Sequence, residues 1–107
     1  MDKEMMKGNI DLILLSLIAK EDLYGYEMTK KLRSISDESY QMSEGTLYPS
    51  LKRMEKKGWI ESYWNDSSGK RRKYYQVTED GVRELKKKRA DWGVLNDLVQ
   101  RTSESHE

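Results

Sequence analysis

The 107-residue sequence contains no cysteine and no phenylalanine, and only one proline and one histidine. Without cysteine the chain can form neither a disulfide nor a thiolate metal site, and a reducing compartment suits it. The single histidine, His106, can build neither a histidine-based catalytic triad nor a histidine metal cluster. A glycine-rich phosphate loop is also missing, and the carboxylates are scattered among lysines rather than isolated in pairs. We therefore expect no enzymatic activity, no metal ion and no cofactor.

Long apolar runs are missing as well. The longest run, at residues 12–15, is far shorter than the ~20 residues that cross a bilayer. The N-terminal residues carry charges of both signs and lack the organisation of a signal peptide. These absences predict a cytoplasmic protein.

Charge, in contrast, is abundant. Charged and apolar residues each make up 36% of the sequence, so we expect one small domain with a thin core and a strongly hydrated surface. A partner subunit would bury additional apolar area. The net charge of +1 neither favours nor excludes a nucleic-acid partner, so the distribution of the charges has to decide.

Apolar periodicity predicts two helices in the first third of the chain. Residues 5–19 carry apolar side chains on nearly every face, which indicates deep burial or a shared interface. Residues 23–35 are predicted to form an amphipathic helix whose buried stripe consists of Tyr24, Met28, Leu32 and Ile35. Residues 36–42 are polar and unpatterned, and we expect a turn there.

A third helix is predicted for residues 43–58. Ser43 is a suitable N-cap, and Gly58 suits the position just beyond the last turn. The expected buried face consists of Leu47, Leu51 and Met54. Pro49 would delete a backbone hydrogen bond to Gly45, so a kinked first turn is expected, with regular helix from about Pro49. By itself this segment could be an ordinary surface helix or a helix that reads a DNA groove.

Beyond residue 58 the apolar period changes from that of a helix to that of a strand. Residues 59–64 and 72–77 are predicted to pair as a β-hairpin through the turn residues 65–69. The hairpin carries a basic cluster at its tip and along its returning strand: Lys70, Arg71, Arg72 and Lys73. Thr78 is a suitable N-cap for a last helix, and residues 102–107 are predicted to be a disordered tail.

Two helices, a basic helix and a basic hairpin follow one another in the order of a winged helix-turn-helix. The expected fold class is therefore mainly α with a small β-hairpin. Residues 1–78 form the winged helix-turn-helix domain, and residues 79–101 form a long C-terminal helix. No internal repeat or linker interrupts the chain.

Four motifs in this order resemble the PadR family of transcriptional regulators. They are Tyr24-Gly25-Tyr26-Glu27, then Gly45-Thr46-Leu47-Tyr48-Pro49, then Leu51-Lys52-Arg53-Met54-Glu55 with Gly58, and finally Arg72-Lys73-Tyr74-Tyr75 with Thr78-Glu79-Asp80-Gly81. The resemblance is close over residues 10–81. It implies a homodimeric bacterial regulator, usually a repressor of efflux or stress-detoxification genes. Trp59 departs from the smaller aliphatic residue typical of the family, which should alter only the packing of the wing.

The short C-terminal region resembles the smaller PadR subfamily, in which the first and last helices build the dimer interface. By this resemblance the expected interface comprises Leu12, Leu15, Val82, Leu85, Trp92, Leu95 and Val99. Some members bind planar aromatic compounds between the subunits, and the matching positions here are Trp92, Asn96, Met5 and Met6. Trp92 has a second interpretation, as a plain interface residue of a regulator that takes no ligand.

The partner expected for this fold is a palindromic duplex operator, entered by two reading helices that a two-fold axis relates. The residues expected to contact it are Ser43, Thr46, Tyr48, Pro49, Lys52, Arg53, Gly69, Lys70 and Arg71. Which of them reach bases rather than phosphates stays open. The alternative from another functional class is a winged-helix adaptor for proteins, whose basic hairpin is only a solvated surface.

Overall fold

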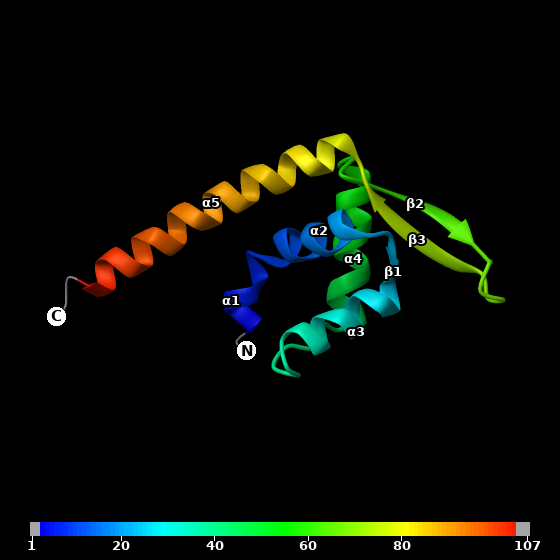
Figure 1. Cartoon of the computed structure of the whole chain (residues 1–107), viewed down its shortest axis with the longest axis horizontal. Coiled ribbons are helices and arrows are strands. Elements are labelled where there is room, and N and C mark those ends of the chain that lie inside the picture. Colours follow the sequence, from blue (N-terminus) through cyan, green and yellow to red (C-terminus); the bar gives the residue numbers. More distant parts are fainter. Residues whose placement is uncertain (1–2, 105–107) are drawn as a thin grey trace.

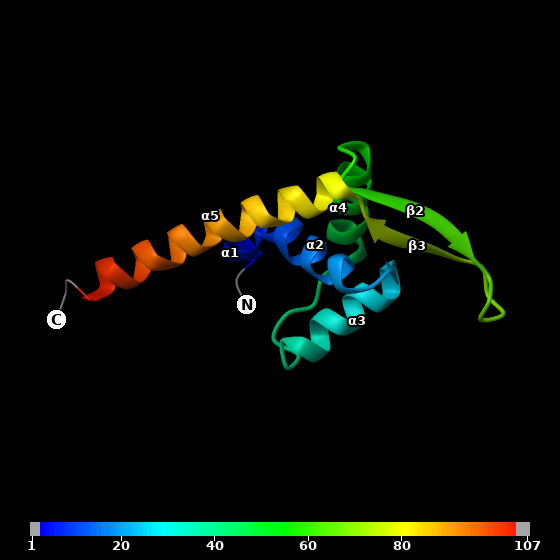
Figure 2. The ribbon, with the colours of Figure 1, turned by 45° about the horizontal axis from the view of Figure 1, so that its top comes forward.

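In this computed structural model, which describes residues 3–104, the chain forms five helices and a three-stranded sheet (Figure 1). Their order is α1 (Lys3–Lys7), α2 (Ile10–Lys20), β1 (Leu23–Tyr24), α3 (Gly25–Ile35), α4 (Glu44–Lys56), β2 (Ile60–Asn65), β3 (Arg72–Val77) and α5 (Glu79–Glu104). The β2–β3 hairpin and α5 start beside each other at one corner of a body built of α2, α3 and α4 and extend in opposite directions (Figures 1 and 2). The expected fold class, mainly α with a small hairpin, is confirmed.

The core lies where α2, α3 and α4 meet the root of the sheet. Leu47, Leu51 and Met54 are all buried, which confirms the predicted inner face of α4. They pack in one cluster with side chains from α2, α3 and the strands, among them Leu14, Ile18, Met28, Ile60 and Tyr75. This cluster fixes the orientation of α4, because a helix with one apolar face buries that face against its neighbours.

The N-terminal segment was predicted as one helix, and that prediction is wrong. The chain leaves the helix after Lys7 and re-enters it at Ile10. The Asn9 side-chain amide donates to the Met5 carbonyl at 3.2 Å, and its backbone N–H donates to the Met6 carbonyl at 2.8 Å. Glycine followed by asparagine favours such a break, because glycine has a low helix propensity and the asparagine side chain competes for backbone groups.

The start of α3 also differs from the prediction. Leu23 and Tyr24 were expected in the helix, but they form β1 and pair antiparallel with Tyr75 and Tyr74 of β3. The backbone N–H of Tyr24 donates to the Glu27 carboxylate at 3.2 Å, which satisfies a free N–H at the entrance of α3. The two-stranded hairpin is thereby extended to a three-stranded antiparallel sheet with the strand order β1-β3-β2.

Two details of the predicted helices need correction. Ile35, placed on the buried stripe of α3, is 70% exposed, because it is the last residue of the helix and lies beyond the core. Pro49 does not interrupt α4, which runs without a break from Glu44 to Lys56. Pro49 and Gly45 are both exposed, so the Gly45 carbonyl that loses its donor remains accessible to water.

Trp59 joins the end of α4 to α5. Its carbonyl accepts the Thr78 N–H at 3.0 Å, and the centroid of its ring is 4.7 Å from the Lys57 ammonium and 5.1 Å from the Lys88 ammonium. A side chain at Gly81 would overlap the Trp59 carbonyl, so glycine is required for α5 to begin this close to β2. The expectation that Trp59 affects only the wing is therefore wrong, because the residue also contacts α5.

The last helix begins as predicted and ends later. The Thr78 hydroxyl accepts the Gly81 N–H at 3.0 Å and donates to the Gly58 carbonyl at 2.6 Å, which confirms the N-cap. The predicted disordered tail is helical over residues 102–104, and residues 105–107 lie outside the described part of the chain. Along the C-terminal half of α5, residues 89–104 are exposed in the protomer.

Candidate nucleic-acid interface

The N-terminus of α4 is capped by Ser43. Its hydroxyl accepts the backbone N–H of Thr46 at 3.2 Å and donates to the Thr46 hydroxyl at the same distance. The acidic Glu44 follows in the first turn, where it complements the positive end of the helix dipole. The predicted cap is confirmed, and it aligns the first turn of α4 without any external partner.

The solvent side of α4 is a stripe of five exposed residues at helical spacing. This outer stripe consists of Gly45, Tyr48, Pro49, Lys52 and Lys56. Both of its charged residues are lysines, so it presents positive charge beside small and aromatic groups. Three of the residues expected to contact DNA therefore lie together on the outer stripe, and Lys56, which was not among the expected contacts, lies there with them.

Two other expected residues face a different direction. Arg53 forms an ion pair with Asp11 of α2, whose side chain is only 17% exposed. Thr46 lies two turns earlier on the same side of α4, and it lines a hollow together with Ser43 and residues of α1. This side of α4 lies next to the N-terminal helices, but the Arg53 side chain is still 46% exposed.

The wing is the hairpin formed by β2, β3 and the turn between them. Its basic residues lie in two places, at the tip and at the start of β3. At the tip, Lys70 and Arg71 are exposed, and the Arg71 guanidinium lies 4.6 Å from the centroid of the Trp64 ring. Gly69 adopts the left-handed conformation that closes the turn, with its N–H bonded to the Asp66 carbonyl at 3.1 Å. The tip is thus shaped as the sequence predicted.

Nearer the body, Arg72 and Lys73 lie at the start of β3. The Arg72 guanidinium is 4.5 Å from the centroid of the Tyr24 ring, and the Lys73 ammonium is 5.8 Å from that of Tyr75. These two cations border a hollow of about 330 Å³ between β3, α3 and α4, which we call the α4–wing hollow. It is lined by Tyr24, Gly25, Tyr48, Arg72, Lys73 and Tyr75.

A row of tyrosines crosses the three-stranded sheet about midway along the wing. Tyr24, Tyr74 and Tyr63 come from three adjacent strands, and the ring centroids of successive members are 5.4 and 5.8 Å apart. The Tyr63 hydroxyl donates to the Asp22 carboxylate at 2.6 Å, and this bond raises the pKa of Tyr63 to about 12. The sequence analysis missed this row, because it depends on β1, which was not predicted.

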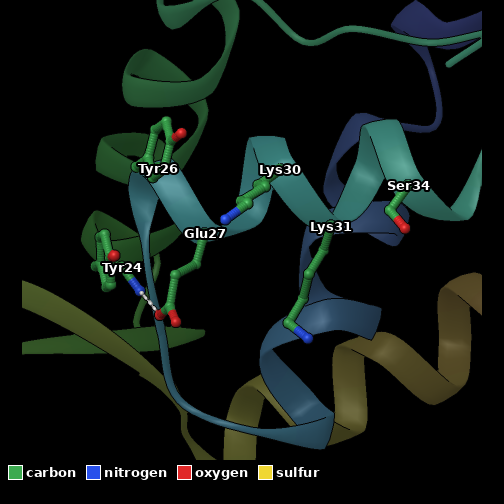
Figure 3. Close-up of a pocket in the computed structure, with 6 residues that line it drawn as sticks. All are labelled: Tyr24, Tyr26, Glu27, Lys30, Lys31 and Ser34. Atoms are coloured by element: carbon green, nitrogen blue, oxygen red, sulfur yellow. Dashed lines mark hydrogen bonds between the residues drawn. The ribbon is translucent and has the colours of Figure 1, made fainter.

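The outer face of α3 adds further cations (Figure 3). Tyr26 is 62% exposed, and the Lys30 ammonium lies 6.0 Å from the centroid of its ring. Lys31 lies on the same helix, where its ammonium is 3.9 Å from the Glu21 carboxylate. Together with Tyr24, Glu27 and Ser34 these residues line a shallow hollow of about 350 Å³.

The residues expected at a dimer interface are divided between the core and the surface. Leu15 and Leu85 are buried inside the protomer, so their side chains have no free surface for a partner. Leu12 is half-buried. Exposed apolar side chains are numerous along α5: Val82, Trp92, Val94, Leu95, Leu98 and Val99.

The four residues expected to hold an aromatic ligand are not brought together in the protomer. Trp92 lines a hollow of about 210 Å³ between α2 and α5, with Leu12, Leu95 and the segment at Gly8 and Asn9. Met6 is buried and borders the separate hollow that Thr46 lines. Met5 and Asn96 are exposed and border neither hollow.

Over residues 3–104 no cluster of three or more histidine, cysteine, aspartate or glutamate side chains is placed to hold a metal ion. In the same range no helix has the length and apolar character needed to cross a membrane.

Comparison with known proteins assigns the family. The model of the transcriptional regulator PadR-like family matches residues 14–87. A transcriptional regulator from Clostridium thermocellum has a similar structure, with a TM-score of 0.86 and 36% identity over 92% of this chain and 97% of that one. The transcriptional regulator Rv3488 of Mycobacterium tuberculosis is 32% identical over 74% of this chain and 71% of its own length.

A further similar structure is that of Bacillus subtilis PadR in complex with operator DNA. Its TM-score is 0.64 and its identity 26%, over 78% of this chain and 45% of that one. The resemblance of the four sequence motifs is thereby confirmed, and the family consists of regulators rather than enzymes. The chain belongs to the PadR-like family of transcriptional regulators.

Proposed function

We propose that the chain is a homodimeric repressor that binds a palindromic DNA operator with the outer stripe of α4 and the wing of each protomer. One observation carries this proposal. Tyr48 of the outer stripe and Arg72 and Lys73 of the wing border the same hollow, so the two basic elements form one surface. An α-helix fits the major groove of B-DNA, and a hairpin beside it reaches the adjacent minor groove or its phosphates.

Within this surface the residues have different tasks. Lys52, Lys56, Lys70 and Arg71 neutralise phosphates and release counterions, which makes the affinity depend on salt. Ser43, Tyr48, Pro49 and Gly69 shape the approach to the duplex. Thr46 and Arg53 lie nearer the N-terminal helices, and the exposed Arg53 side chain would contact DNA only by leaving or sharing its partner Asp11.

The apolar side chains of α5 support the dimer. Trp92, Leu95 and Val99 recur at helical spacing and are about half exposed, with values of 49, 54 and 53%. An exposed apolar stripe of this length on a highly charged protein indicates an interface. We place Leu12 and Val82 at the margin of an interface formed by paired α5 helices. A two-fold axis through this interface would set the two reading helices roughly 34 Å apart, which is one turn of DNA.

Regulation by a ligand follows from the same interface. The hollow beside Trp92 is open in the protomer, and a second α5 would close it into a site for a planar aromatic compound. In the dimer, the exposed Met5 and Asn96 of either protomer would complete its walls, whereas the buried Met6 would support Met5 from inside the protomer. A ligand that favours the wrong spacing of the reading helices would release the operator. The regulated genes would be those of an efflux or detoxification operon in a bacterial cytoplasm, where binding to DNA associates the protein with the nucleoid.

The DNA proposal is tested by titrating the chain into a duplex that carries the region upstream of its own gene, at several salt concentrations. We expect two protomers per duplex and an affinity that falls steeply with salt. Changing Lys70 and Arg71 to Ala should weaken binding to all duplexes. Affinity that ignores salt, or that survives this change unaltered, would favour the protein adaptor instead.

The dimer is tested by Leu95→Glu, with Lys87→Glu as a matched control on the same helix. Sedimentation velocity should show a monomer for the Leu95 variant and a dimer for the control, because only the first places a charge in the apolar stripe. A Leu95 variant that stays dimeric would refute the α5 interface.

Ligand binding is tested by adding a planar cationic dye and measuring the quenching of tryptophan fluorescence. The Trp92→Leu variant gives the quenching of Trp59 and Trp64 alone, which is subtracted from the wild-type signal.

A further inference from the structure

We propose that the α4–wing hollow is a phosphate-binding site that holds one backbone phosphate of the operator. This inference rests on the proposed function and assigns DNA contact to Arg72, Lys73 and Tyr24, three residues outside the set expected to contact the operator. It places the main anchor of the wing beside the reading helix, rather than only at the exposed tip.

The first argument is the chemistry of the lining. Arg72 and Lys73 supply two positive charges, and Tyr24, Tyr48 and Tyr75 supply phenol groups, which can donate hydrogen bonds. None of the six residues that line the hollow is acidic. Positively charged walls without a carboxylate select an anion, and a phosphate diester offers acceptor oxygens to both kinds of donor.

The second argument is the state of the two cations. The six ion pairs found in residues 3–104 include neither Arg72 nor Lys73. Arg72 is half-buried, with its guanidinium over the Tyr24 ring and a weak hydrogen bond of 3.4 Å to the Ser68 hydroxyl. Stacking on a ring orients a guanidinium while leaving donors at its edge available. Arg53, in contrast, already has Asp11 as its partner.

The third argument is the position of the hollow between two DNA-reading elements. A helix in the major groove and a hairpin at the adjacent minor groove are separated by one sugar–phosphate strand. The surface that joins the two elements must lie over this strand. In this chain that surface is the α4–wing hollow, which Tyr48 borders from α4 and Arg72 borders from β3.

The charge of the hollow is tested with Arg72→Gln combined with Lys73→Gln, and with Lys86→Gln combined with Lys87→Gln as a control. The control removes the same charge from α5, outside the proposed DNA surface. For the hollow variant we expect operator binding at least about tenfold weaker, and a salt slope smaller by about 2, since each of two phosphates in the dimer contributes roughly 0.9. The control should retain the wild-type slope. Lys73→Gln alone leaves the Arg72 stacking intact and should give a smaller change in the same direction.

The phosphate itself is located by replacing single linkages of the duplex with neutral methylphosphonates. One position in each half-site, between the two grooves, should weaken wild-type binding by about tenfold but the hollow variant by less than about twofold, because the two changes remove the same contact. Equal losses for both proteins at every position would overturn the assignment. If operator binding by the wild-type protein did not depend on salt, that result would instead disprove the proposed function.

A free phosphate compound is the other possible source of the anion. Titration calorimetry with inorganic phosphate distinguishes it from the DNA backbone. We expect no saturable binding at millimolar concentration, because the hollow is completed only by the duplex. Saturable binding that the hollow variant loses, together with an unchanged salt slope, would overturn the assignment to DNA.

Discussion

The ring of Tyr48 lies directly over Gly25, so the reading helix and the start of α3 meet at a residue without a side chain. A Cβ atom at Gly25 would come within 2.5 Å of the Tyr48 hydroxyl and 2.9 Å of two ring carbons. Tyr48 is nevertheless 46% exposed, so it is held by α3 and presented to solvent at the same time. This contact fixes one wall of the α4–wing hollow.

Gly25→Ala should therefore displace Tyr48. The added methyl group overlaps the end of the Tyr48 side chain, which is about half exposed and can swing outward, so the loss of stability should stay below the ~1–3 kcal/mol of overpacking in a closed core. We expect a nearly unchanged free energy of unfolding in urea but weaker operator binding in fluorescence anisotropy. Gly93→Ala is the control, because a Cβ there meets nothing within 4 Å. Equal operator affinities for the two variants would contradict the role of the Gly25–Tyr48 contact.

Adjacent residues of α4 should respond differently to truncation. Lys52→Ala removes a cation from the outer stripe and should weaken operator binding about tenfold, with a smaller salt slope and unchanged stability. Arg53→Ala breaks the ion pair with Asp11 and should lower the free energy of unfolding by about 0.5–1 kcal/mol, as for partly exposed pairs. Asp11→Ala should reproduce that loss of stability. A greater loss of affinity from Arg53→Ala than from Lys52→Ala would show that Arg53 leaves Asp11 to contact DNA.

Trp59, just before β2, and Trp64, within β2, should differ in their contribution to stability. Trp59→Leu removes a half-buried ring and two cation–π contacts, so we expect a loss of about 1–3 kcal/mol in chemical denaturation. Trp64 is 57% exposed and has one such contact, with Arg71, so Trp64→Leu should lower stability by less than about 1 kcal/mol. Similar losses for both would indicate that Trp59 does not join α4 to α5.

Alkaline pH should weaken the contact between Tyr63 of the wing and Asp22. Because the bond to Asp22 raises the pKa of Tyr63 to about 12 from 10.0, the folded state keeps the proton that the unfolded chain releases. The contribution of Tyr63 is complete below pH 10 and is lost as the pH rises toward 12. The urea midpoint of the wild type should therefore fall more between pH 9 and 11.5 than that of Tyr63→Phe, which has no hydroxyl to ionise. Parallel decreases would indicate that the Tyr63–Asp22 bond does not persist in solution.

Elements that depend on nearby residues were predictable from the sequence. The inner face of α4, the Ser43 and Thr78 caps and the hairpin turn at residues 65–69 follow from spacing and from local hydrogen bonding. The break at Gly8 and Asn9 also had a local signal, the glycine–asparagine pair, which the strong apolar pattern around it outweighed. The strand at Leu23 and Tyr24 had none, because it forms only by pairing with β3, about fifty residues later.

The sequence by itself determined the order of the main helices and the hairpin, and the family, because helical and strand periodicity, caps and turn residues act over a few positions of the chain. Only the tertiary structure decided which cations face outward. Periodicity fixes the angle between Lys52 and Arg53 around α4, but Asp11, which takes Arg53 as its partner, lies 42 residues away. In the same way, Arg72 enters the α4–wing hollow because Tyr24 lies in β1 beside it. Contacts between distant segments divide one basic composition into structural ion pairs and a surface that is free to bind phosphate.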